Sequence, residues 1–161
     1  MGETFQGLDP VYDENSKVLI LGSFPSVKSR EVAFYYGNPQ NRFWRTLSSF
    51  FGEDLPKSTE EKRAFLKRNK IALWDIVTEC EIVGSQDAAI KNFCVADINS
   101  LLQNSQIGFI ILNGGKAFGI FEENYGGIKI PYVKLTSTSP ANPRFTTKEW
   151  FDVLSRAFDR T

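Results

Sequence analysis

The sequence predicts an α/β protein, specifically a three-layer α/β/α sandwich with a central four-stranded, mainly parallel sheet. Short apolar, β-branched runs recur along the chain, helical signals separate them, and no linker, repeat or low-complexity tract divides the 161 residues. Alternation of strands and helices is typical of a parallel sheet that is covered by helices on both faces. A chain of this length forms one domain, so residues 1–161 are predicted to fold as a unit.

Four apolar runs have the length and composition of buried strands. They are Lys17–Leu21, Ile71–Ile76, Ile107–Leu112 and Tyr132–Leu135. No run reaches the roughly eighteen apolar residues of a membrane span. The N-terminal stretch lacks a basic head followed by an apolar segment, so we expect no secretory signal.

Helical signals fall between and after these strands. Ser58 and Thr146 each precede a glutamate by three residues, which is the capping-box pattern of a helix start. From Asn41 onward, apolar residues recur on one helical face. Further helices are predicted over Val95–Asn104 and directly after Asn113.

The composition excludes several catalytic chemistries. The chain has no histidine, so it lacks a Ser-His-Asp or Cys-His nucleophile system. Its two cysteines, Cys80 and Cys94, lie outside any C-x-x-C spacing, which argues against a zinc site or an iron–sulfur cluster. No clustered acidic motif indicates magnesium. We therefore expect no metal, no cofactor, and free thiols in a reducing cytoplasm.

Three polar loops follow predicted strands, and ligands of parallel sheets bind beyond the carboxyl ends of the strands. They are Gly22–Asn41, Asn113–Lys116 and Ser137–Arg144, and we expect them to converge. Taken singly, the first and third are explained as ordinary turns. The second is not a phosphate-binding P-loop, because Ile110 and Ala117 replace the required glycine and hydroxyl residue.

The stretch Phe34–Trp44, FYYGNPQNRFW, holds five aromatic residues around Asn-Pro-Gln-Asn. Phe43 and Trp44 are expected in the core, and Asn41 is a good candidate for a helix N-cap. Tyr36 belongs to the preceding loop, at the mouth of the sheet. A ring in that place can stack on a planar base.

The order of GSFPS, FYYGNPQNRFW, ILNGG and STSPAN resembles the uracil-DNA glycosylase superfamily, and within it the deoxyinosine (hypoxanthine-DNA) glycosylase branch. The segment Ala72–Asn92 is similar to a part specific to that branch. The segment NPQNRFW also resembles mismatch-specific glycosylases. The likeness runs from about Gly7 to Phe158, so it implies a single glycosylase domain over residues 1–161.

The resemblance implies roles for individual residues. Many members carry a catalytic Asp or Asn in the first motif, but Phe24 stands at that place here and cannot orient water by hydrogen bonding. We therefore assign the catalytic, water-orienting role to Asn38, with Asn41 as the competitor. Tyr36 matches the aromatic residue that stacks on the base. The residues expected to bind the base are Gly22, Ser23, Phe24, Tyr36 and Asn113.

The second superfamily motif, Ser137–Asn142, implies contacts with DNA phosphates and with the gap left by a rotated nucleotide. A formal net charge of zero argues against binding by bulk charge, although a local basic face remains open. The residues expected to contact DNA are Lys28, Arg42, Ser137, Thr138, Ser139, Pro140, Ala141, Asn142 and Arg144.

The implied function is that of a monofunctional DNA glycosylase in base excision repair. It would act as a monomer on double-stranded DNA containing deaminated bases, rotate the base out and excise it hydrolytically, hypoxanthine (deoxyinosine) first. We expect it in the cytoplasm, associated with the nucleoid if the source is prokaryotic. Three alternatives stay open: a mismatch-type uracil or xanthine glycosylase, a non-catalytic nucleic-acid binding module, and a nucleoside hydrolase, which the missing carboxylate cluster disfavours.

Overall fold

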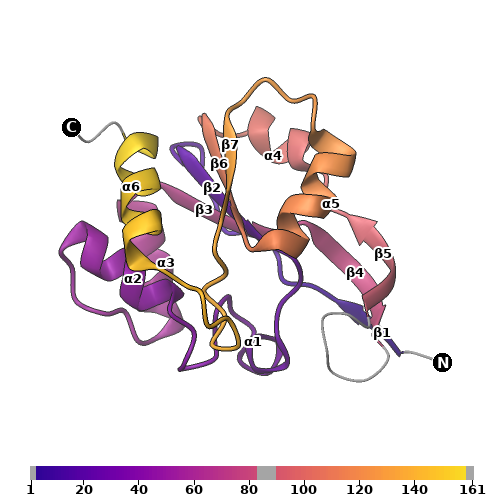
Figure 1. Cartoon of the computed structure of the whole chain (residues 1–161), viewed down its shortest axis with the longest axis horizontal. Coiled ribbons are helices and arrows are strands. Elements are labelled where there is room, and N and C mark those ends of the chain that lie inside the picture. The colour runs from indigo at the N-terminus through magenta and orange to yellow at the C-terminus, as the bar shows by residue number, and fades with distance from the viewer. Residues whose placement is uncertain (1–2, 83–89, 159–161) are drawn as a thin grey trace.

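A four-stranded, fully parallel sheet forms the centre of the computed structural model, which describes residues 3–82 and 90–158 (Figure 1). The strand order is β3-β2-β6-β7. The predicted strands are confirmed, with ends that differ by no more than two residues. The four strands are β2 (Val18–Gly22), β3 (Ile71–Asp75), β6 (Phe109–Asn113) and β7 (Tyr132–Leu135).

Buried side chains alternate between the two faces of this sheet. In β2, Leu19 and Leu21 belong to one apolar cluster, whereas Val18 and Ile20 belong to the other. Because successive side chains of a strand point to opposite faces, a fully apolar strand requires cover on both sides.

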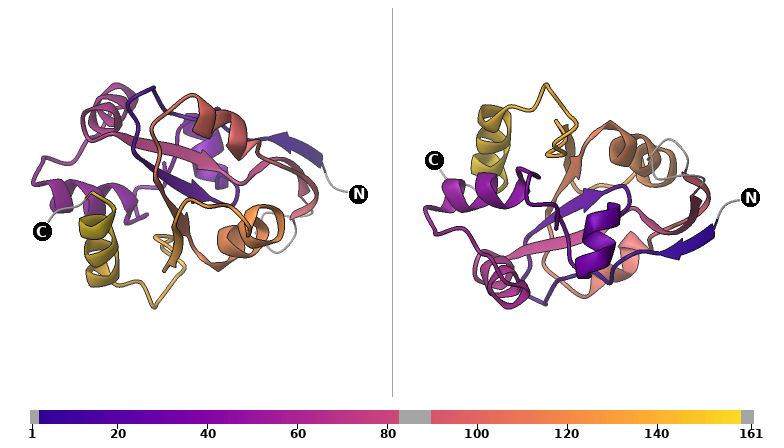
Figure 2. Two further views of the ribbon diagram at one scale, coloured as in Figure 1. Left: turned by 90° about the horizontal axis from the view of Figure 1, so that it is seen from above. Right: turned by 90° about the horizontal axis from the view of Figure 1, so that it is seen from below.

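Helices supply that cover and complete the predicted three-layer α/β/α sandwich. Figures 1 and 2 show α2, α3 and α6 on one side of the sheet and α4 with α5 on the other. A short additional helix, α1, lies within the first loop and was not predicted. The helices are α1 (Val27–Val32), α2 (Phe43–Phe51), α3 (Thr59–Arg68), α4 (Ile98–Gln103), α5 (Gly115–Tyr125) and α6 (Thr147–Ala157).

A second, antiparallel sheet of order β1-β4-β5 was also not predicted. It consists of β1 (Glu3–Gln6), β4 (Val77–Ile82) and β5 (Ile90–Val95), and β4 follows β3 after the single residue Ile76. The sequence VTECEI has charged residues within the strand and lacks a clean alternation of apolar and polar residues, so its pattern gave no strand signal. Part of the predicted wall segment Thr78–Asn92, namely residues 83–89, lies outside the described residues.

Two helix starts differ from the prediction. The helix predicted from Val95 begins only at Ile98, because Val95 ends β5 and the Asp97 side chain accepts a hydrogen bond from Ser100 N at 3.2 Å. The prediction of a capping box at Thr146 is wrong. Glu149 Oε1 accepts from the backbone N of residue 136, at 2.7 Å, and the Thr146 side chain makes no cap hydrogen bond.

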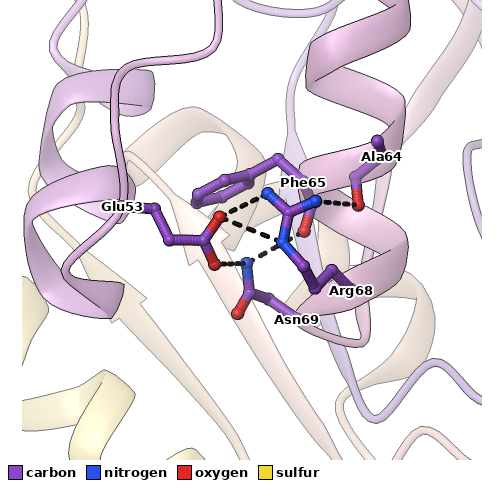
Figure 3. Close-up of polar contacts among 5 residues, drawn as sticks. All are labelled: Glu53, Ala64, Phe65, Arg68 and Asn69. Atoms are coloured by element: carbon purple, nitrogen blue, oxygen red, sulfur yellow. Dashed lines mark hydrogen bonds and ion pairs between the residues drawn. The ribbon is translucent and has the colours of Figure 1, made fainter.

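A polar cluster anchors the connection between α2 and α3 (Figure 3). The Glu53 carboxylate forms an ion pair with Arg68 and accepts from Asn69 Nδ2 at 2.9 Å. Asn69 Nδ2 also donates to Phe65 O at 3.0 Å, and Ser58 Oγ caps α3 through Glu61 N at 3.0 Å. The segment between Glu53 and Ser58 is therefore held at both ends.

We expect Glu53→Gln to lower the free energy of unfolding by about 0.5–1 kcal/mol at neutral pH, because Arg68 is exposed and the ion pair lies at the surface, where solvent screens it. Hydrogen bonding from Arg68 lowers the pKa of Glu53 below its ordinary value of 4.5. A depressed folded-state pKa contributes stability above the unfolded-state pKa, and that contribution is lost as pH falls through the folded-state value. Thermal melts of the wild type and variant between neutral and acidic pH measure this difference.

The matched control is Glu123→Gln, a change at an exposed residue of α5. It should leave the melting temperature unchanged, whereas Glu53→Gln should lower it by about 2–4 °C per kcal/mol at neutral pH. A deficit in Glu53→Gln of the same size below and above the folded-state pKa would contradict the ion-pair account.

Within residues 3–82 and 90–158, no helix has both the length and the apolarity needed to cross a membrane. The two cysteines are free thiols as predicted, Cys80 buried and Cys94 exposed.

Candidate active site

A polar pocket of about 180 Å³ lies beyond the carboxyl ends of β2, β3 and β6. The three predicted loops meet there, as the parallel topology requires. Its lining comprises Gly22, Ser23, Phe24, Pro25, Ser26, Ser29, Tyr35, Tyr36, Asn38, Asn41, Asp75, Asn113, Ser137, Thr138, Ser139 and Pro140. All five predicted base-binding residues and both candidate catalytic asparagines are among them.

Asp75 is the single carboxylate among the described residues that line the pocket, and the sequence interpretation missed it. It ends β3, pairs in register with Gly22 of β2 and is only 4% exposed. A Cβ atom on Gly22 would lie 2.6 Å from Asp75 Oδ1 and 3.3 Å from the Tyr36 hydroxyl oxygen. Glycine is therefore needed at residue 22, because the carboxylate and the phenol close over it. The sequence did contain a signal for Asp75 as a site residue, namely an acidic residue at the end of an apolar strand.

Tyr36 is held in place before any ligand arrives. Its ring stacks on Phe43 with centroids 4.1 Å apart and planes inclined by 19°, and its backbone adopts a left-handed conformation with φ of 53°. Such a conformation is uncommon for a bulky residue and is typical of functional sites. Phe43 covers one face of the ring, and the prediction that Tyr36 stacks on a base remains a prediction.

The Tyr36 hydroxyl is buried next to two polar groups. Burial raises the pKa of Tyr36 most, the charge of Asp75 raises it further, and the Asn113 amide opposes both. The hydroxyl makes no hydrogen bond of standard geometry within the described residues, so Asn113 acts from a less favourable position. With a raised pKa the phenol stays protonated, and it remains a hydrogen-bond donor inside the pocket.

Asn38 lies at the pocket and is half-buried. Its Oδ1 accepts from Gln40 N at 2.9 Å, which is an Asx turn that fixes the side chain while its Nδ2 carries two donors. The prediction that Asn41 is the N-cap of α2 is wrong, because Arg42 is the N-cap and has no side-chain cap hydrogen bond. Asn41 lies one residue earlier, and its Oδ1 accepts from Phe43 N at 2.9 Å. The water-orienting role of Asn38 stays a prediction. The Asn38 side chain lines the pocket and is not enclosed in the core.

A buried serine supports the loop that carries Asn38. Ser29 Oγ accepts from Gly37 N at 2.9 Å and lies 3.1 Å from Ser26 Oγ. A Cβ atom on Gly37 would lie 2.5 Å from Val32 Cγ2, so the loop packs directly on α1. The unpredicted helix α1 therefore positions the residue before Asn38.

Asn113 joins the end of β6 to the loop after β7. Its Nδ2 donates to Thr138 Oγ1 and its Oδ1 accepts from Thr138 N, both at 3.0 Å. Both residues are buried, at 9% and 1% exposure. Because each amide atom has one bond to Thr138, one hydrogen and one lone pair remain for other partners. The predicted base-binding role is not tested by this geometry.

Arg42 fixes the predicted DNA-binding loop from within. Its Nη2 donates to Ser139 O at 2.5 Å and to Asn142 O at 2.7 Å, and its guanidinium lies 4.6 Å from the Phe145 ring centroid. Asn142 Nδ2 donates to Ser137 O at 2.9 Å. The loop is thus preformed, and these bonds show Arg42 as its support. The exposed members of the predicted DNA-binding set are Lys28, Pro140, Ala141 and Arg144.

The part of the chain that the structure describes contains no group of three or more His, Cys, Asp or Glu side chains arranged to hold a metal ion. The pocket instead offers amides, hydroxyls, a phenol and one carboxylate. The fold and this pocket define the class as α/β proteins that bind a ligand beyond the carboxyl ends of parallel strands.

A family model described as the uracil DNA glycosylase superfamily matches residues 10–158. The chain therefore belongs to the uracil DNA glycosylase superfamily, and it is a DNA glycosylase that acts on DNA.

Two similar proteins are named hypoxanthine DNA glycosylase. The one from Methanosarcina acetivorans is 39% identical over 150 residues, which cover 90% of this chain and 94% of the relative. The one from Methanosarcina barkeri is 39% identical over 140 residues, covering 86% and 89%. A solution NMR structure from Methanosarcina acetivorans, of a protein provisionally named a uracil DNA glycosylase, superposes with a TM-score of 0.85 at 36% identity and covers 97% of this chain and 99% of that one.

Proposed function

We propose that this glycosylase removes hypoxanthine from double-stranded DNA, after the deoxyinosine nucleotide has rotated out of the helix into the pocket. The observation that carries the proposal is the buried Asp75 carboxylate, which lies beside the protonated Tyr36 hydroxyl at the end of β3. The names of the two relatives support the same base.

The carboxylate and the phenol match the edge of hypoxanthine. Hypoxanthine presents a ring N–H donor next to a carbonyl acceptor, so Asp75 accepts from the first and Tyr36 donates to the second. Adenine presents a bare ring nitrogen next to an amino group, the reverse order. With adenine the Asp75 carboxylate would face a bare ring nitrogen and the Tyr36 hydroxyl would face an amino group, two mismatches that cost about 1–3 kcal/mol each. Such mismatches discriminate strongly between related ligands.

Rotating a nucleotide out of a duplex costs a few kcal/mol, and less when the base is mispaired, as inosine is after deamination. Contacts of the rotated purine with the lining of the pocket offset part of that cost. The preformed loop held by Arg42 and Asn113 would support the distorted strand through backbone and hydroxyl groups of residues 137–142.

Hydrolysis follows from the position of Asn38. Its amide orients a water molecule toward the anomeric carbon, and orientation of this kind contributes several kcal/mol. The water oxygen bonds to that carbon as the bond to the base nitrogen breaks, the electron pair leaves with the base, and the water proton passes to the base or solvent. The hydrogen bond from the Tyr36 hydroxyl stabilises the negative charge that develops on the departing base. No covalent enzyme intermediate is needed, so the reaction is monofunctional.

Duplexes with a single inosine, uracil or xanthine, incubated with the protein and then treated with alkali, test the assignment. Inosine should be excised with the highest kcat/KM, and undamaged adenine duplexes should stay intact. Xanthine and uracil also carry a ring N–H that Asp75 can accept, so slower cleavage of both is expected. Uracil cleaved faster than inosine would replace the proposal with a mismatch-type uracil glycosylase, and no cleavage of any duplex would reject excision of deaminated bases.

A further inference from the structure

A second hollow, of about 280 Å³, adjoins the base pocket. Tyr36, Asn38 and Asn41 line both spaces, so the segment with the candidate catalytic residues forms their shared wall. The remaining lining of the second hollow comes from the same loop before α2, from α2, from the segment before α3 and from α3 itself. It comprises Gly37, Pro39, Trp44, Arg45, Leu55, Pro56, Lys57 and Lys62.

The charges of this hollow have one sign. Among the residues that the structure describes, Arg45, Lys57 and Lys62 line it and no carboxylate does. In the described part of the chain none of the three forms an ion pair, whereas other basic residues such as Lys148 do. Cations gathered without anions repel one another, and a bound anion removes that repulsion.

Lys62 is the most constrained of the three cations. Its side chain is half-buried, with Nζ 5.3 Å from the centroid of the Trp44 ring, and burial lowers its pKa. A cation held over an aromatic ring in partial burial has few orientations to lose when it binds an anion.

The wall that presents Lys57 is also fixed. The segment Leu55–Lys57 lies between Glu53, whose ion pair with Arg68 is drawn in Figure 3, and Ser58, which caps α3. Lys57 N itself donates to Glu61 Oε1 at 2.8 Å. The position of the hollow is therefore set by bonds that need no ligand.

We propose that this basic hollow binds a backbone phosphate of the target DNA strand, next to the nucleotide that enters the base pocket. The inference rests on the proposed function insofar as it needs a nucleotide in that pocket. A strand that places one nucleotide beside Asn38 brings its flanking phosphates to the other side of the same segment. Phosphate contacts fix position without reading sequence, as an enzyme acting at scattered lesions requires.

Salt-dependent binding tests this site. Arg45→Gln, Lys57→Gln and Lys62→Gln are each titrated with a duplex that contains a tetrahydrofuran abasic analogue, between about 50 and 200 mM salt. Each lost phosphate contact should make the plot of log K against log salt shallower by about 0.9. Lys67→Gln is the matched control, because Lys67 lies exposed on α3 and lines neither hollow.

Lys62→Arg keeps the positive charge but changes the packing of the side chain on Trp44. It should keep the wild-type slope, which would show that the slope depends on the charge at residue 62. Thermal melts confirm folding, and the exposed positions 45 and 57 keep the test informative if Lys62→Gln is unstable. Slopes for all three Gln variants equal to that of Lys67→Gln would overturn the proposal. The titration needs no base excision, so loss of the hypoxanthine assignment and loss of the phosphate site give different results.

Discussion

Replacing Asn38 by alanine is expected to lower kcat on inosine duplexes about a hundredfold or more while DNA binding is kept. Misplacement of a reacting group by about 1 Å can lower the rate about a hundredfold, and without the amide no side chain of residue 38 orients the water. Asn38 is half-buried on a turn and belongs to no core cluster, so the fold should tolerate the change. Single-turnover kinetics with saturating enzyme measure the chemical step directly.

The control for this experiment is Asn99→Ala, the same change at an exposed position of α4 outside the pocket. Its kcat should match the wild type. Asn41→Ala is the informative comparison, because loss of its cap-like bond to Phe43 N should reduce stability by about 1 kcal/mol. If the folded Asn41→Ala protein loses more turnover than Asn38→Ala, the water-orienting role belongs to Asn41.

Asp75→Asn is expected to lower kcat/KM for inosine about ten- to a hundredfold. A hydrogen bond to a charged group is worth about 1.5–3 kcal/mol, and each 1.4 kcal/mol is a factor of ten. The asparagine keeps the shape of the side chain next to Gly22 but adds a donor where only acceptors stood. That donor suits the bare ring nitrogen of adenine, so the preference for inosine over adenine should also fall.

Asp54→Asn, at an exposed site outside the pocket, should change neither quantity. Binding to the abasic-analogue duplex shows whether the Asp75 variant keeps its DNA surface. An Asp75→Asn enzyme with wild-type kcat/KM for inosine and undiminished selectivity would remove Asp75 from base recognition.

The sequence alone was sufficient to predict the strands of the central sheet. β2 and β6 are short, apolar and almost fully buried, and they end at Gly22 and Asn113, which are residues typical of turns, so local pattern and final structure agree. The convergence of the three loops followed from parallel topology. The antiparallel sheet was not predictable in the same way, because β4 carries partly exposed charged positions and depends on pairing with β1, more than seventy residues away.

The composition of the pocket was predicted, but its internal bonding was not. Asn113 and Thr138 exchange two hydrogen bonds across 25 residues of sequence, and Arg42 reaches carbonyl groups about a hundred residues away. Neither partner choice has a local signal. Asp75 was overlooked because it stood within a run interpreted only as a strand. Its depth and its contact with Gly22 become visible only once β2 and β3 lie side by side.

Arg42 has one more consequence. It directly follows Asn41 and donates hydrogen bonds to the carbonyl oxygens of Ser139 and Asn142. The loop of residues 137–142, which would contact the DNA, is therefore rigidly connected to the loop that carries Asn38 and Asn41. Binding of a duplex to the loop of residues 137–142 should therefore also stabilise the loop that carries Asn38. Free nucleosides, which have no flanking backbone to press on it, should be hydrolysed poorly, and the cellular pool of purine nucleosides would be spared.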